Sequence, residues 1–170
     1  MCVVFAVGIV RAGDVKMDTT VNGQRIELHV LPAEPFFTKG QVAAGAPKEG
    51  MLIIGGAKPV LPDAETHPNQ HLVVHVFDLK TDKAITDAKV KMSFQALDEK
   101  GNLTGSPIDV PVVVMQAIGK GPQSTHYGNN VAMPDGPLAI SIVVNGKKLK
   151  FTLNRVYAPS GSMEDMHMDQ

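Results

Sequence analysis

Alternating hydrophobic and polar residues predict most of this chain to consist of short β-strands. In residues 26–30 and again in residues 90–96, aliphatic or aromatic side chains occupy every second position and polar side chains lie between them. A period of two is typical of a strand that buries one face and exposes the other. His29 falls on the polar face of its strand, where we expect it to be solvated.

Other segments add to this pattern. Residues 71–78 are largely apolar on both faces, which predicts a central strand, and a strand is expected over residues 110–115, where Pro111 indicates an edge or a strand start. Asn145-Gly146 lies between two alternating runs, which is the strongest short signal for a hairpin. About eight short strands and no amphipathic helix predict an all-β fold, a β-sandwich.

The chain of 170 residues fits one domain, with two atypical ends. Residues 1–12 are an apolar run that ends in a small residue, which predicts a signal-peptide remnant; the alternative is a buried first strand. Residues 13–156 are expected to form a β-sandwich metal-binding domain. Residues 157–170 are expected to be a flexible tail, whose Met and His side chains could capture Cu(I).

Composition narrows the possible partners and sites. Sixteen basic and 17 acidic residues give a net charge of −1, which argues against a nucleic-acid partner. Residues 1–12 are too short to span a membrane, and no stable membrane anchor is predicted. Cys2 is the single cysteine and would leave with the signal segment, so a metal would be held by His, Met or carboxylate. No catalytic constellation is recognisable, and no enzymatic activity is predicted.

Histidine and methionine provide the candidate chemistry. His126 follows Met115 by eleven residues, and His67, His71 and His75 lie within nine residues. Imidazole suits copper, iron and zinc, and a thioether selects for Cu(I). A lone histidine is more often a surface residue, and a lone methionine is usually core. Because residues i and i+4 of a strand are about 13 Å apart, we expect only one of His71 and His75 to bind a given ion.

The run from His126 to Met133, HYGNNVAM, together with the histidine strand of residues 70–78, resembles the P19 family of periplasmic, iron-transport-associated, copper/iron-binding proteins. The resemblance implies an immunoglobulin-like β-sandwich, a homodimer, and a copper site made by His and Met from several strands. It also implies action beside an inner-membrane iron permease. On this resemblance, His71 and His126 match ligand histidines, and Met115 matches a ligand methionine.

The chain departs from the family pattern at three points. Val73 stands where the family has a glutamate, a family methionine falls near Pro35, and a further family histidine has no counterpart. Glu34, His67 and the methionines of the tail are candidates to replace the missing ligands. Loss of hard carboxylate donors would shift the site from iron toward copper, or would give a weaker site for either ion.

These features predict a periplasmic metal-binding protein for copper, iron or both, acting in high-affinity metal uptake beside a membrane permease. One alternative is a metal-free β-sandwich adaptor that docks to a membrane partner. Another is a metal-oxidising redox protein that uses the same site. Metal affinity is expected to fall below about pH 6 as imidazoles protonate.

Overall fold

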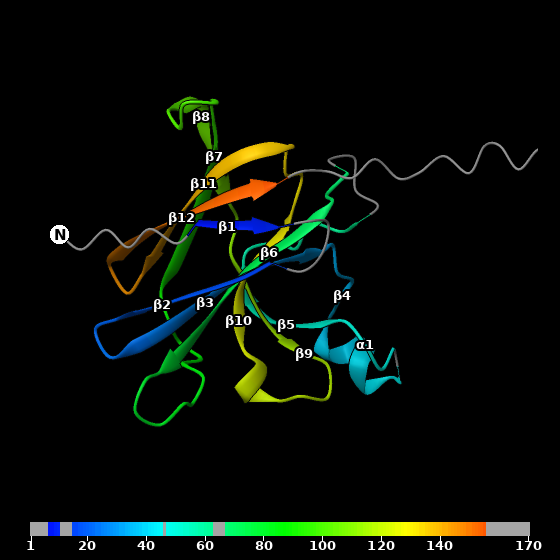
Figure 1. Cartoon of the computed structure of the whole chain (residues 1–170). Helices are drawn as coiled ribbons and strands as arrows, with labels where there is room; N and C mark the ends of the chain where they lie inside the picture. The colour runs from blue at the N-terminus through cyan, green and yellow to red at the C-terminus, as the bar shows by residue number, and fades with distance from the viewer. Residues whose placement is uncertain (1–6, 11–14, 46, 63–66, 156–170) are drawn as a thin grey trace, which may run out of the picture.

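The protein is a two-layer β-sandwich, which confirms the predicted all-β class (Figure 1). The computed structural model describes residues 7–10, 15–45, 47–62 and 67–155. One sheet has five strands, in the order β1 (Val7–Val10), β12 (Lys147–Arg155), β11 (Gly136–Val144), β7 (Val90–Leu97) and β8 (Leu103–Val110). The other sheet has seven strands, in the order β2 (Val15–Val21), β3 (Gln24–Pro32), β6 (Gln70–Asp78), β10 (His126–Val131), β9 (Val113–Ala117), β5 (Met51–Gly56) and β4 (Phe36–Phe37).

The described residues therefore contain twelve strands rather than about eight. Some of the additional strands, such as β4 with two residues, are short. The side chains of β8 are exposed at every position except Val110, so this strand carries no hydrophobic period to detect. Two short helices, α1 (Lys39–Ala43) and the 3-10 turn η1 (Pro122–Ser124), complete the described elements. No helix in these ranges is long and apolar enough to cross a membrane.

The main core fills the space between the two sheets. Leu28 and Leu72 from the seven-stranded sheet and Phe94 and Ile140 from the five-stranded sheet belong to one buried aliphatic and aromatic cluster. Burial of such side chains contributes about 1.5–3 kcal/mol each. The alternation seen in the sequence therefore corresponds to the inner faces of the sandwich.

The β11–β12 hairpin turns at Asn145-Gly146, as predicted. Both residues have positive φ, 49° and 81°, as a type I′ turn requires. Pro111, by contrast, is not inside a strand. It lies between β8 of one sheet and β9 of the other, so the expected continuous strand over residues 110–115 is wrong. Proline cannot donate a ladder hydrogen bond, which suits a residue where the chain crosses between sheets.

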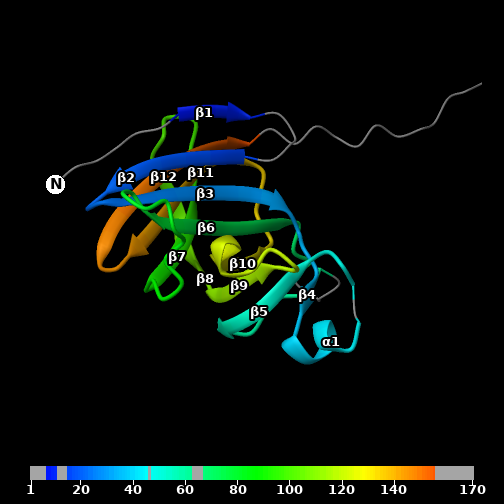
Figure 2. The ribbon, with the colours of Figure 1, turned by 90° about the horizontal axis from the view of Figure 1, so that it is seen from below.

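The seven-stranded sheet is strongly curved. In Figure 2 it passes from β2 and β3 through β6, β10 and β9 to β5, with β4 and α1 at its far end. Phe36 of β4 and His71 of β6 are separated by three intervening strands, yet their ring centroids are 5.8 Å apart. A second, smaller buried cluster lies here, made by Phe36, Val73, Val113 and Met115. The curvature thus creates a separate interior on the face of β6 that points away from the main core.

The first described strand bears on the predicted signal segment. Val7–Val10 form β1, which pairs in parallel with β12. Residues 11–14, where the predicted cleavage point falls, lie outside the described residues, as does the expected Met/His tail over residues 157–170. Cleavage after Ala12 and metal capture by the tail both stay predictions.

Candidate metal centre

The site is built by three adjacent strands, β6, β10 and β9. In the antiparallel pairing, Asn130 faces His71 across β10 and β6, and His126 faces Met115 across β10 and β9. Residues paired in this way have Cβ atoms about 4.5–5.5 Å apart on the same face of the sheet. The register therefore brings together His71, His126 and Met115, three of the five residues predicted as ligands.

Gly128 makes this register possible. It lies between His126 and Asn130 on the same face of β10, opposite Val73. A Cβ atom at this position would lie 2.0 Å from the carbonyl oxygen of Leu72, which is far closer than any real contact. The glycine in the HYGNN run thus allows β10 to approach β6 closely enough for the His71 and Asn130 side chains to bond.

Asn130 fixes the orientation of the His71 ring. Its Nδ2 donates hydrogen bonds to the carbonyl oxygens of Glu34 and Val60, both at 2.8 Å, so its Oδ1 must be an acceptor. Nδ1 of His71 lies 2.9 Å from that oxygen and therefore carries the proton. In the neutral ring this leaves a lone pair on Nε2. Nε2 of His71 is the one fully buried side-chain polar atom in the described ranges without a hydrogen-bond partner.

His126 is held in the same tautomer by its own backbone. Its Nδ1 lies 2.7 Å from the carbonyl oxygen of Ser124, which can only accept, so Nδ1 is the donor. The 3-10 turn η1 positions this carbonyl just before β10. A hydrogen bond from the second nitrogen to a carbonyl or amide oxygen is the arrangement found around metal-binding histidines. Both His71 and His126 thus present Nε2 as the available ligand atom.

Two further histidines extend the group into a row. Ring centroids lie 5.7 Å apart between His71 and His126, 4.9 Å apart between His126 and His75, and 4.8 Å apart between His75 and His29. The sequence pattern predicted a solvated side chain for His29, and this prediction is wrong, because the His29 ring packs against that of His75. Its side chain is only 20% exposed, and its Nε2 lies 3.2 Å from Oε2 of Glu27. We call these four residues the histidine row.

Burial keeps the inner histidines neutral. Burial, reinforced by His126 and partly opposed by the Asn130 hydrogen bond, lowers the pKa of His71 to about 4. Burial also lowers the pKa of His126 to about 4, against the effect of its Ser124 hydrogen bond. Burial, and then the neighbouring His126 and His29, lowers the pKa of His75 to about 3. These rings stay unprotonated, which is the form that binds metals, down to near pH 4. The loss of metal affinity that the sequence predicted below about pH 6 is therefore expected near pH 4 instead, because burial lowers the pKa values of the ligand histidines.

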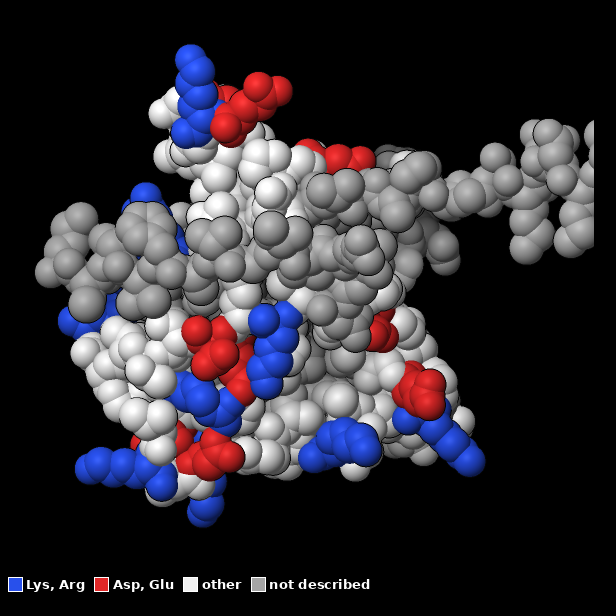
Figure 3. Space-filling model, viewed as in Figure 1, with Lys and Arg blue, Asp and Glu red and all other residues white. Residues whose placement is uncertain are grey.

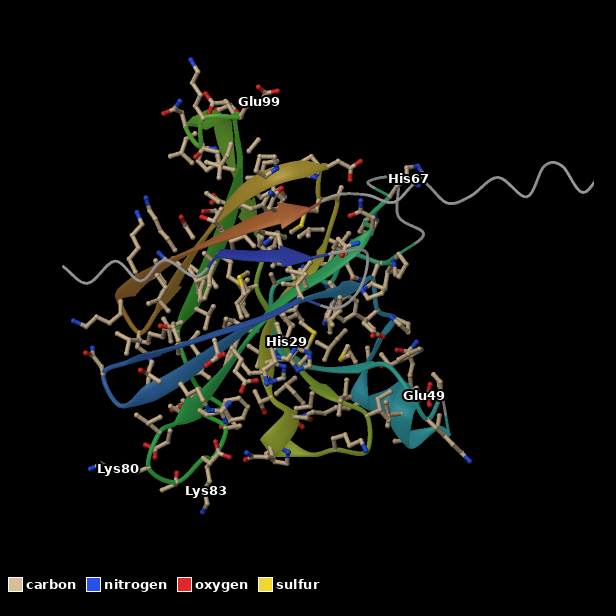
Figure 4. The ribbon with its side chains drawn as sticks, viewed as in Figure 1. His29, Glu49, His67, Lys80, Lys83 and Glu99 are labelled. Carbon is tan, nitrogen blue, oxygen red and sulfur yellow. The ribbon has the colours of Figure 1, made fainter. Side chains whose placement is uncertain are left out.

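The remaining predicted ligands are placed differently. The backbone of Glu34 is anchored to the site, since its N–H donates to Oδ1 of Asn130 and its carbonyl oxygen accepts from Nδ2. His67 is exposed and precedes β6, and Figure 4 shows it well apart from His29. The structure thus brings the Glu34 segment beside His71 but leaves His67 outside.

Hard ligands are scarce around the row. Within the described ranges, no three His, Cys, Asp or Glu side chains converge closely enough to hold an ion by themselves. The candidate site therefore needs the Met115 thioether as its third donor. Charged side chains on the surface are interspersed rather than segregated by sign on the face seen in Figure 3.

Three residues of the site were not predicted from the sequence: His75, His29 and Asn130. His75 and His29 were set aside because each was judged within its own strand, whereas His126 lies between His71 and His75 from the neighbouring strand. The signal that could have found Asn130 is its spacing of four from His126, which puts both on one face of β10.

Comparison of the chain with protein-family models, with curated proteins and with solved structures gives no match.

Proposed function

We propose that this protein is a periplasmic metal-binding protein that holds a copper or iron ion as cargo and acts in metal uptake beside a membrane permease. The observation that carries the proposal is the buried, unpartnered Nε2 of His71 beside His126, whose Nδ1 is likewise bonded to a protein acceptor. An isolated buried polar atom costs about 1–3 kcal/mol. Binding of an ion would repay this cost.

The donor set favours copper over iron. Two neutral imidazoles and one thioether are borderline to soft ligands, which suit Cu(I). Val73, next to the site on the same face of β6, is fully buried and offers no hard donor. Met115 is also fully buried, in the small cluster with Phe36, Val73 and Val113, so water is excluded on that side. Such a dry, thioether-containing site stabilises the reduced ion.

The homodimer, the permease partner and the periplasmic location rest on the resemblance of the HYGNNVAM run and the histidine strand alone. The metal-free adaptor and the metal-oxidising protein remain the alternatives. Metal binding by the purified chain separates the first alternative from our proposal, and turnover of Fe(II) or Cu(I) would reveal the second.

Titration with Cu(I) tests the proposal. We expect the wild-type protein to bind one equivalent against a competing chelator, and a His71→Ala/His126→Ala variant to lose this binding. His67→Ala is the matched control and should bind as the wild type does, because His67 lies outside the row. Binding that survives the double substitution would contradict the assignment.

Replacement of Met115 should change metal preference more than stability. Leu is close to Met in volume, and such swaps in a core cost less than about 1.5 kcal/mol. We expect Met115→Leu to weaken Cu(I) binding about tenfold, or about 1.4 kcal/mol, while Zn(II) binding to the two imidazoles changes little. Competition titrations with both ions measure the difference. Equal weakening for Cu(I) and Zn(II) would show that the thioether is not a ligand.

A further inference from the structure

We infer that His75 and His29 form a transfer path along which the metal ion passes between the surface and the buried site. This inference rests on the proposed function, because it concerns how the same cargo reaches His71, His126 and Met115. His75 and His29 are not needed as ligands of the bound ion. They occupy the only direction in which the histidine row continues from the site within the described residues.

Exposure is greater at the His75 and His29 end of the row than at the His71 and His126 end. His71 is fully buried and His126 is 3% exposed, whereas His75 is half-buried and the side chain of His29 is 20% exposed. The opposite side of the site is closed by the apolar cluster of Phe36, Val113 and Met115. An ion without ligands is strongly disfavoured in such an apolar region, because it has lost its hydration shell. The histidine side therefore offers the passage.

The spacing of the rings suits transfer from ligand to ligand. Successive centroids along the row lie 4.8, 4.9 and 5.7 Å apart. Bonds between a metal and an imidazole nitrogen are about 2.0–2.1 Å long. With small rotations of the rings, an ion can therefore contact two successive histidines at once. It can then exchange one for the next without an intermediate that lacks protein ligands.

An ion-pair network anchors the outer end of the path. Oε2 of Glu27 lies 3.2 Å from Nε2 of His29 and 3.0 Å from Nζ of Lys16, and the carboxylate also pairs with Arg25. The ring of His75 stacks on Phe77, with an angle of 1° between the ring planes. The buried Glu27 carboxylate holds His29, and the stacked Phe77 ring holds His75 in place. These contacts give His29 and His75 fixed positions before the metal arrives.

Transfer kinetics distinguish a path from a binding site. A change that raises a barrier but leaves both end states alone must slow uptake and release by the same factor. We expect His29→Gln and His75→Leu each to slow Cu(I) uptake and Cu(I) release about tenfold, measured by stopped-flow exchange with a chromogenic chelator. The dissociation constant should stay at the wild-type value. His67→Gln, the matched exposed control, should change neither rate.

Two results would overturn the inference while the proposed function stands. Wild-type rates in both folded variants would show that the ion takes another route. A larger dissociation constant with an unchanged rate of Cu(I) uptake would show that His75 or His29 is a ligand of the bound ion rather than part of the transfer path. Absence of Cu(I) binding by the wild-type protein would instead refute the proposed function, and the inference with it. His29→Gln keeps a donor for Glu27 at a partly exposed position, so this variant should fold even if His75→Leu does not.

Discussion

The metal-free protein is expected to lose much of its stability between pH 6.5 and pH 4. In this range an unfolded histidine, with a pKa of about 6.5, takes up a proton. Folded His71 and His126 do not, because their pKa values are lowered to about 4. The unfolded state therefore binds more protons than the native state, and the free energy of unfolding falls as the pH falls through this window. Above pH 6.5 the effect is absent.

The size of this effect rivals the stability of a whole domain. One pKa unit corresponds to about 1.4 kcal/mol, so each of these two histidines destabilises the acid form by on the order of 3 kcal/mol. His75, whose pKa is lowered to about 3, acts in the same direction, and Lys16 and His29 contribute to its shift. Small domains are typically stable by only about 5–15 kcal/mol. Unfolding near pH 4 is the expected outcome.

Urea denaturation of the metal-free protein at pH 7.5, 5.5 and 4.5 measures this loss. A His71→Gln/His126→Gln variant should show a smaller pH dependence, to which the remaining His75 still contributes, since glutamine does not titrate. His67→Gln should retain the wild-type dependence, because His67 is exposed. A free energy of unfolding that differs by less than about 1 kcal/mol between pH 7.5 and 4.5 would contradict the buried, neutral state of the row.

Replacement of Asn130 by alanine is expected to damage both the fold and the metal site. The side chain joins four groups: Nδ1 of His71, the backbone N–H and carbonyl of Glu34, and the carbonyl of Val60. A buried group left without its partner costs about 1–3 kcal/mol. We expect Asn130→Ala to lower the free energy of unfolding by about 4 kcal/mol, since water cannot easily replace all four contacts.

The same variant should bind Cu(I) about 10–100-fold more weakly than the wild type, because the His71 ring loses the acceptor that fixes its tautomer. Chemical denaturation and chelator competition measure the two effects. Asn102→Ala is the matched control. Asn102 is exposed and forms its hydrogen bonds with Asp98 within a surface turn. Its replacement should therefore change the free energy of unfolding and the Cu(I) affinity little. Wild-type affinity in a folded Asn130→Ala protein would show that His71 needs no orientation by this residue.

The sequence alone predicted the strands that face the main core, because burial on one side imposes a strict alternation. Residues 71–78, 90–96, 138–144 and 147–153 lie in β6, β7, β11 and β12. β2 and β8 were both missed. β2 was not predicted although its buried Val15 and Met17 alternate with exposed residues, and β8 extends as an exposed hairpin arm that buries no alternating face. Hydrophobic patterning cannot predict a strand such as β8, which is held in its sheet mainly by backbone hydrogen bonds.

Only part of the site was predicted, because which residues of different strands become neighbours depends on the pairing and register of those strands. His71, His126 and Met115 were found through the HYGNNVAM run and the histidine strand, and they lie on one face. The distance rule that separated His71 from His75 is sound along one strand. It could not show that His126 of β10 would lie between them, because no pattern within a single strand specifies which strand becomes its neighbour.

Because β1 pairs in parallel with β12, removal of residues 1–12 would expose an edge of the five-stranded sheet. β12 would then become the outermost strand of its sheet, with the peptide groups of residues 152–155 deprived of the partner that now covers them. An uncovered strand of this kind is a template for the backbone of another chain. A chain from which residues 1–12 have been removed should therefore self-associate more readily than the full chain, edge to edge through β12.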